Sequence, residues 1–115
     1  MNKENNQEQI ICVASTGNTI DAKIDSHFGR CEYFIIIKIK NNKIINAEAI
    51  KNTGLRHSHG VGISAAEIVG KSGAKIVISG NFGPKAIDVL KQLGIKTRID
   101  SGSVKNAIQK YIKSI

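Results

Sequence analysis

Two hydrophobic periods, one helical and one typical of a strand, alternate along residues 63–93 (ISAAEIVGKSGAKIVISGNFGPKAIDVLKQL). Residues 63–71 carry apolar side chains at helical spacing and are followed by a Ser-Gly pair, which predicts a helix and its end. Residues 74–79 (AKIVIS) form a short, almost wholly apolar run, as expected of a strand buried on both faces. Pro84 suits the first turn of a second helix, which closes before Gly94. This order predicts an α/β domain with a parallel part in its sheet.

Upstream of this segment the pattern is that of antiparallel strands. Residues 10–15 (IICVAS) are a second continuous apolar run. Residues 33–40 (YFIIIKIK) and 43–51 (KIINAEAIK) lie on either side of an Asn41-Asn42 turn, which predicts a β-hairpin. Because a hairpin joins antiparallel strands, we expect this half of the chain to supply the antiparallel part of the sheet.

Downstream, residues 95–100 (IKTRID) predict a last strand, and Ser101 or Ser103 can cap a final helix. The apolar positions of that helix follow the i, i+3, i+4, i+7 pattern: Val104, Ala107, Ile108, Tyr111, Ile112 and Ile115. The predicted order is β-β-β-α-β-α-β-α, which gives one mixed sheet in a single domain over residues 10–115. Residues 1–9 (MNKENNQEQ) are polar, and we expect them to form a disordered tail.

The composition narrows the choice of partners. The 115 residues hold 17 Lys and Arg against 9 Asp and Glu, a formal charge of +8, so the natural partners are anions. Few aromatic side chains are available to stack on bases and few of the cations are arginines, which disfavours nucleic acid. No apolar run is long enough to span a membrane. Cys12 and Cys31 are too few for a disulfide scaffold, so we expect a cytoplasmic protein.

The two long loops of the chain concentrate its metal-binding and guanidinium side chains. The first loop ends in residues 27–31 (HFGRC), and the second contains residues 56–62 (RHSHGVG). Imidazole and thiolate groups bind iron, copper, zinc and sulfide-rich clusters, and guanidinium groups offset the charge of a bound anion. The candidate metal ligands are His27, Cys31, His57 and His59, and the candidate counter-charges are Arg30 and Arg56.

Glycines at two predicted helix starts suggest further contacts to an anion. The second loop leads into a helix whose first N–H groups favour anions, and Gly60 and Gly62 allow a ligand to approach the backbone. The loop with Gly80, Asn81 and Gly83 follows a buried strand, at the edge of the sheet where α/β proteins bind ligands. These five residues are therefore candidate cofactor-binding positions.

Ordinary structural roles compete with these assignments. A His-x-His segment is often polar surface, Cys12 is expected to be a core residue, and His27 can be a hydrogen-bonded residue that orients its loop. The spacing Gly60-x-Gly62-x-x-Ala65 also fits a relaxed dinucleotide fingerprint, although the expected acidic residue further along the chain is missing. A nucleotide-binding enzyme or sensor is therefore the alternative function.

Four pieces of the sequence together resemble the dinitrogenase iron–molybdenum cofactor biosynthesis family. They are the HFGRC run at residues 27–31, the HSHGVG loop at residues 57–62, the IVISGNFGP segment at residues 76–84 and the closing helix. The family comprises small NifX-type proteins and relatives of the C-terminal part of NifB. The resemblance covers about residues 10–115, and the order of its motifs is more specific than any one of them.

The resemblance implies a three-layer α/β/α, ribonuclease H-like fold with a five-stranded mixed sheet. It implies a non-catalytic carrier or scaffold for an anionic metal–sulfur cluster: the iron–molybdenum cofactor, its iron–sulfur precursor or a related molybdenum–sulfide cluster. Other cluster-maturation proteins are the expected partners of a monomer or weak homodimer. The family's binding positions fall on three segments: His27, Phe28, Gly29 and Arg30; His57, His59, Gly60 and Gly62; and Gly80, Asn81, Gly83 and Pro84. Cys31 departs from the family pattern, in which a small or apolar residue is common.

Overall fold

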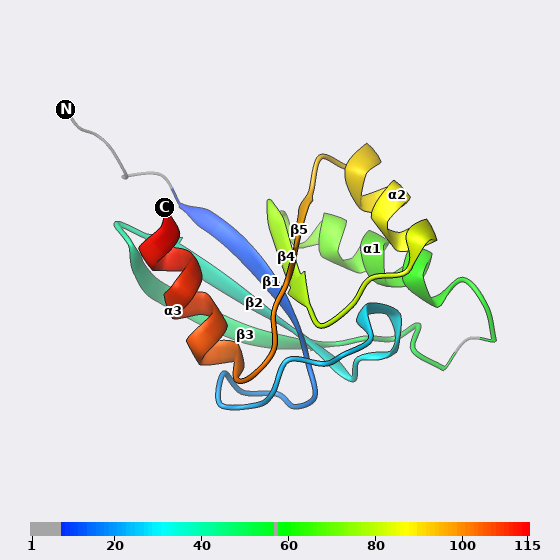
Figure 1. Ribbon diagram of the computed structural model, residues 1–115, viewed down its shortest axis with the longest axis horizontal. Coiled ribbons are helices and arrows are strands. Elements are labelled where there is room, and N and C mark those ends of the chain that lie inside the picture. The colour runs from blue at the N-terminus through cyan, green and yellow to red at the C-terminus, as the bar shows by residue number, and fades with distance from the viewer. Residues whose placement is uncertain (1–7, 57) are drawn as a thin grey trace.

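Five strands form one mixed sheet in the structure, a computed structural model that describes residues 8–56 and 58–115 (Figure 1). They are β1 (Gln9–Ser15), β2 (Tyr33–Lys40), β3 (Lys43–Lys51), β4 (Ile76–Ser79) and β5 (Lys96–Ile99). Their order across the sheet is β3-β2-β1-β4-β5. The β3-β2 and β2-β1 pairs are antiparallel, and the β1-β4 and β4-β5 pairs are parallel. The predicted mixed sheet is therefore confirmed.

The central strand β1 is apolar on both faces because it has a core on each side. Ile11 and Val13 pack into one hydrophobic cluster, while Cys12 and Ala14 pack into the other. All four side chains are fully buried. Burying an aliphatic side chain of this size contributes about 1.5–3 kcal/mol to folding. The run of consecutive apolar residues thus reflects a strand covered from both sides.

Three α-helices in the described part of the chain supply that cover (Figure 1). The helix α3 (Val104–Ser114) packs on the sheet face that carries Ile11. The helices α1 (Val61–Lys71) and α2 (Pro84–Gln92) pack on the opposite face. The result is the expected three-layer α/β/α arrangement. None of the helices formed by the described residues is both long enough and apolar enough to cross a membrane.

Local sequence signals account for where most of the helices and strands begin or end. Asn41 and Asn42 have positive φ angles of 54° and 63°, the geometry that an Asn pair tolerates in a hairpin turn. Of the two candidate caps, Ser103 is the one used, and its hydroxyl accepts a backbone N–H at 3.1 Å. The helix α1 begins at Val61, two residues before the predicted start, because Gly60 adopts a left-handed φ of 75° and turns the chain there.

The structure corrects the prediction at the N-terminus and in the first loop. Gln9, which the sequence pattern places in the polar tail, is the first residue of β1 and pairs with Ile39. Residues 1–7 of the expected tail lie outside the described residues. The first loop contains a short 3-10 turn, η1 (Phe28–Arg30), that sequence periodicity does not reveal. Three residues are too few to show a hydrophobic period.

The carboxyl ends of β1 and β4 meet at one edge of the sheet because these strands are parallel neighbours. From that edge, β1 continues through the first loop to β2 on one side. The strand β4 continues through α2 to β5 on the other side. Connections that diverge in this way leave a crevice outside the strand ends, where α/β proteins place their ligand sites.

Candidate functional site

The loop after β4 holds the loop after β1 through hydrogen bonds. Gly80 donates its backbone N–H to the carbonyl oxygen of Asp25 over 2.9 Å, and Phe28 donates its N–H to the carbonyl oxygen of Asn81 over 3.3 Å. The carboxylate of Asp25 accepts the backbone N–H of His27 over 2.9 Å. The position of residues 25–28 is therefore set by the end of β4.

Small residues allow the first loop and both helix starts to come together. A Cβ atom on Gly29 would lie 2.9 Å from Cγ2 of Val61 and 3.0 Å from the backbone nitrogen of Gly62. A Cβ atom on Gly62 would lie 3.2 Å from Cβ of Ala86. Because these distances are shorter than ordinary contacts, the first turn of α1 touches both η1 and the first turn of α2.

The second loop is attached to the first by Asn52 and Arg30. Nδ2 of Asn52 donates to the carbonyl oxygens of Gly29 (3.1 Å) and Cys31 (2.9 Å). Nη1 of Arg30 donates to the carbonyl oxygen of Leu55 over 2.8 Å. The two loops that the sequence marks as a candidate site are therefore in direct contact.

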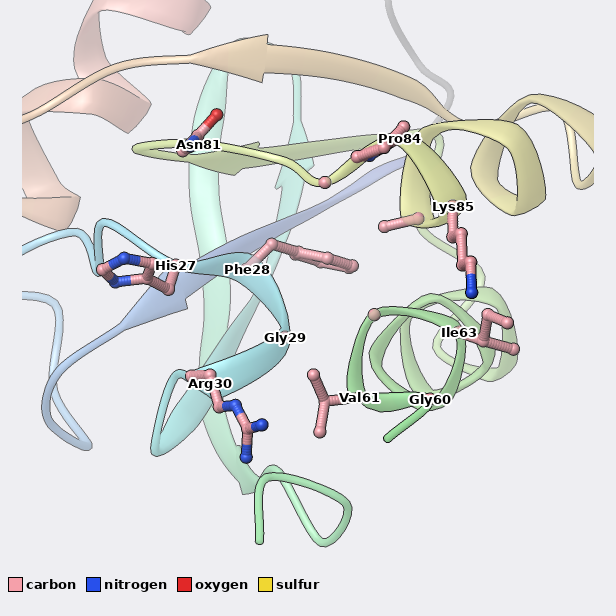
Figure 2. Close-up of a pocket in the computed structure, with 13 residues that line it drawn as sticks. His27, Phe28, Gly29, Arg30, Gly60, Val61, Ile63, Asn81, Pro84 and Lys85 are labelled. Atoms are coloured by element: carbon pink, nitrogen blue, oxygen red, sulfur yellow. The ribbon is translucent and has the colours of Figure 1, made fainter. Parts of the chain in front are cut away.

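These contacts shape an open cavity of about 490 Å³ between η1 and the first turns of α1 and α2 (Figure 2). The volume is in the usual range for a small-ligand site. Arg30 and Lys85 are its charged members, and none of the described residues that line it is acidic. The lining comes from three segments: His27, Phe28, Gly29 and Arg30; Gly60, Val61, Gly62 and Ile63; and Asn81, Gly83, Pro84, Lys85 and Ala86.

Both helices start at the cavity without a side-chain cap or an acidic residue in the first turn. The first helical hydrogen bond of α1 runs from the N–H of Ser64 to Gly60, and that of α2 from the N–H of Ile87 to Gly83. Earlier N–H groups have no acceptor within their own helix. The partial positive charges of two helix N-termini therefore face one cavity, which favours an anion there.

Lys85 and Arg30 add full positive charges from different segments (Figure 2). Figure 2 shows the Lys85 side chain extending from α2 toward the first turn of α1, while the Arg30 side chain points from η1 toward the second loop. A lysine in the first turn of a helix opposes the helix dipole, so Lys85 places its charge where the backbone is already positive.

The cavity includes some predicted site residues and leaves others outside. Gly80 supports the cavity without lining it, Arg56 lines a separate pocket of about 290 Å³, and His59 is exposed on the second loop. His57 lies outside the described residues. The predicted residues that do line the cavity are His27, Arg30, Gly60, Gly62, Asn81 and Gly83.

Cys31 lies in the core, not among the residues that line the cavity. Its side chain is fully buried, and Sγ donates a hydrogen bond to the carbonyl oxygen of Phe28 over 3.3 Å. Burial, and then the charge of Asp25, raise the pKa of Cys31 to about 12. Cys12 is also fully buried, as predicted, and burial raises the pKa of its thiol well above the usual range. Both sulfurs are thus held as neutral thiols, and Cys31 has no part in the ligand set proposed for the site.

Sequence reasoning missed Val61, Ile63, Lys85 and Ala86, which all line the cavity. Apolar residues at helical spacing are indistinguishable from core residues until the helix is placed. Lys85 did carry a signal, since a basic residue at a helix start is unfavourable unless an anion is near. Ala86 matters through its contact with Gly62, which only the tertiary structure shows.

The arrangement offers charge and N–H donors more than it offers metal ligands. In the described ranges 8–56 and 58–115, no three His, Cys, Asp or Glu side chains lie close enough to hold a metal ion together. His27 is the one imidazole among the described lining residues. The site can therefore surround an anion from several sides, with one imidazole available to a metal within that anion.

Sequence comparisons match this chain to a protein family and to a protein of known sequence. The model of the dinitrogenase iron–molybdenum cofactor family matches residues 9–114. An uncharacterised protein of Methanocaldococcus jannaschii, MJ0580, is 39% identical over 92 residues, which cover 79% of this chain and 78% of that protein.

Solved structures show the same fold over almost the whole chain. The apo form of the orange protein from Desulfovibrio gigas is 35% identical with a TM-score of 0.84, covering 92% of this chain and 88% of that one. TM1290 of Thermotoga, a candidate NifB protein, is 28% identical with a TM-score of 0.74, covering 91% of this chain and 88% of that one.

Proposed function

The chain belongs to the dinitrogenase iron–molybdenum cofactor family, and from that membership we propose that it is a carrier for an anionic metal–sulfur cluster. The cluster is its cargo: the iron–molybdenum cofactor, its iron–sulfur precursor or a related molybdenum–sulfide cluster. The chain receives the cluster, holds it without converting it and releases it to another protein of cluster maturation.

The convergence of two uncapped helix starts on one cavity carries this proposal. The unpaired N–H groups of α1 and α2 can donate hydrogen bonds to the sulfide or oxygen atoms of a cluster. Arg30 and Lys85 offset its negative charge, and no acidic residue among the described lining opposes it. Because these groups come from separate segments, a bound anion is held on several sides.

Apolar walls strengthen the attraction between the cavity and an anion. Phe28, Val61 and Ile63 line the cavity, and a bound cluster that covers them would displace water there, which would lower the effective dielectric constant around the charges. Phe28 is itself held between Phe34 and Phe82, with ring centroids 5.7 Å and 5.2 Å away. A wall fixed in this way keeps its shape when the cavity is empty, so binding costs little conformational entropy.

The proposed metal ligands are His27 from the first loop and His57 and His59 from the second. His27 lines the cavity, and its Nδ1 atom lies 2.9 Å from Oγ of Ser26. Nε2 is then the ring nitrogen available to a cluster metal. We expect the imidazoles to add metal coordination to the attraction that the charges and N–H donors supply.

Purification under strict anaerobiosis from cells supplied with iron and molybdenum tests the proposal. We expect a coloured protein that contains metal and acid-labile sulfide together. Replacing His27, His57 and His59 by Ala should lower both contents, whereas Lys71→Gln, at the far end of α1, should leave them unchanged. Protein free of metal and sulfide from such cells would overturn the carrier function. Unchanged contents in the triple variant would overturn the ligand set alone.

Nucleotide binding is the second candidate because Gly60 and Gly62 line the cavity at the start of α1. Glycines at that place in other α/β proteins admit a phosphate to the helix N-terminus. Titration of the metal-free chain with ATP and NAD at millimolar concentrations decides between the two functions. Saturable binding would favour the nucleotide, and no binding would reject it.

A further inference from the structure

Asn52 is a buried polar residue at the junction of the two loops. Its exposed fraction is 1%, and among the described residues only Ser15 and Ser79 are other buried polar ones. It follows the last residue of β3 and begins the second loop. Its backbone N–H donates to the carbonyl oxygen of Glu32 over 3.0 Å, which ties the start of the second loop to the end of the first.

The side-chain amide of Asn52 has a partner for each of its polar atoms. Nδ2 donates to the carbonyl oxygens of Gly29 (3.1 Å) and Cys31 (2.9 Å), so both of its hydrogens are used. Oδ1 accepts the backbone N–H of Gly54 over 3.3 Å. A flipped amide would set oxygen against two carbonyl oxygens, so the network admits a single orientation.

These three hydrogen bonds hold the backbone on both sides of Arg30 and the turn that contacts its side chain. The two carbonyl groups that Asn52 holds belong to the residues immediately before and after Arg30. Gly54 directly precedes Leu55, whose carbonyl oxygen accepts Nη1 of Arg30 over 2.8 Å. One buried amide therefore fixes both the backbone that carries the guanidinium group and the turn that holds it.

We propose that Asn52 is a positioning residue of the cavity, which sets Arg30 in place before the anion arrives. The inference rests on the proposed function, in which Arg30 offsets the charge of a cluster. Asn52 does not itself line the cavity, so it acts through Arg30 and Gly29. A guanidinium group that is already fixed loses little conformational entropy on binding, so the affinity for the anion is higher.

A double-mutant cycle tests the coupling between the two residues. The probe is tetrathiomolybdate, a compact molybdenum–sulfide dianion, titrated anaerobically into the metal-free chain and followed by its visible absorption. We expect Asn52→Ala and Arg30→Gln each to weaken binding about tenfold, the scale of one charge-assisted contact. The double variant should lose about ten- to twentyfold, not the hundredfold product, because Asn52 acts through Arg30.

A control and a second variant separate positioning from general stability. Val104→Ala removes part of a fully buried side chain on the opposite face of the sheet, so it should lower stability and leave the affinity unchanged. Asn52→Asp keeps the shape of the side chain but sets a carboxylate against two carbonyl oxygens, and it should weaken binding at least as much as Asn52→Ala.

Four results would count against the proposal. Unchanged affinity in both Asn52 variants, or a full hundredfold loss in the double variant, would overturn the role of Asn52 while leaving the carrier function intact. An equal loss of affinity in Val104→Ala would show that stability alone governs binding. If the unaltered chain does not bind the probe, the proposed function is contradicted and this inference falls with it.

Discussion

The backbone of Gly80 passes so close to that of Ser26 that a Cβ atom at position 80 would lie 2.7 Å from the Cα atom of Ser26. Next to this contact, the N–H of Gly80 donates to the carbonyl oxygen of Asp25 over 2.9 Å. A side chain at position 80 would meet backbone, which cannot rotate away. The end of β4 thus fixes the loop that carries His27 and Arg30.

We expect Gly80→Ala to destabilise the protein and to weaken binding at the cavity. The added methyl group forces the two backbones apart, and overpacking of this kind costs about 1–3 kcal/mol. Residues 27–30 follow Ser26 directly, so a shift of Ser26 should disturb the placement of the groups that face a bound anion. Urea unfolding and tetrathiomolybdate titration measure the two effects.

The matched control is Gly83→Ala, three residues along the same loop. A Cβ atom there would have no neighbour within 4 Å, and the φ angle of −74° suits any residue. Because Gly83 is the N-cap of α2 and lines the cavity, this control applies to unfolding and not to binding. We expect a loss of less than about 1 kcal/mol, the scale of replacing one cap residue by Ala. Equal losses of unfolding free energy in the two variants would show that the close approach of Gly80 to Ser26 does not determine the effect of Gly80→Ala.

Much of the fold could be predicted from the sequence because its signals are local. The apolar run of β1 indicates a strand covered on both faces, and Ile11 and Cys12 do pack into different cores. The Asn41-Asn42 pair marks a hairpin turn, and Pro84 marks the first residue of α2. Each of these signals depends on steric and hydrogen-bonding properties of the residue itself, so no tertiary information was needed.

The site could be predicted only as far as the segments that form it. Arg30 and Cys31 are adjacent in sequence, yet Arg30 is among the residues that line the cavity and Cys31 lies in the core. That difference follows from the turn η1 and from the contact of Gly29 with Val61, and neither has a sequence signature. The signal of Lys85 is weak, because a single lysine on a helix usually faces solvent and Lys85 is itself exposed.

Lys85→Gln should weaken the binding of tetrathiomolybdate about five- to tenfold at low ionic strength, because it removes one cation from the cavity. Salt screens the same interaction, so the affinity of the unaltered chain should fall more steeply with added KCl than that of the variant. The control is Lys71→Gln, which removes an equal charge from the last turn of α1. Equal effects of the two substitutions would indicate that net charge, and not the place of Lys85, attracts the anion.

Both cysteines should resist alkylation in the native protein. Burial, followed by the charge of Asp25, raises the pKa of Cys31 to about 12, so about one thiol in ten thousand is ionised at pH 8. Iodoacetamide at that pH should leave the native mass unchanged and should add two groups in urea. Ser58→Cys, at an exposed position of the second loop, serves as a reactive control. Rapid labelling of Cys31 alone would restore it as a candidate ligand.

The carboxylate of Asp100 joins the end of β5 to α3. Its Oδ1 atom accepts the backbone N–H of Ser101 (2.8 Å) and forms an ion pair with Nζ of Lys110 (3.0 Å). Desolvation by burial opposes ionisation, but these hydrogen bonds and the charges of Lys110 and Arg98 outweigh it and lower the pKa of Asp100. A carboxyl group whose pKa is lower in the folded state stabilises the fold above its unfolded pKa of about 3.9.

Asp100→Asn should therefore reduce the unfolding free energy at pH 7 by less than about 1 kcal/mol, since the Lys110 partner is largely exposed and screened. The difference between the variant and the unaltered chain should shrink as the pH falls below about 3.9, because the unfolded state then takes up a proton at Asp100 first. It should vanish below the lowered pKa of the folded state, where Asp100 is protonated in both states. Urea unfolding at a series of pH values measures it, with the exposed substitution Glu67→Gln as control. A difference that stays constant down to pH 2 would mean that the side chain stabilises the fold by packing, not by its charge.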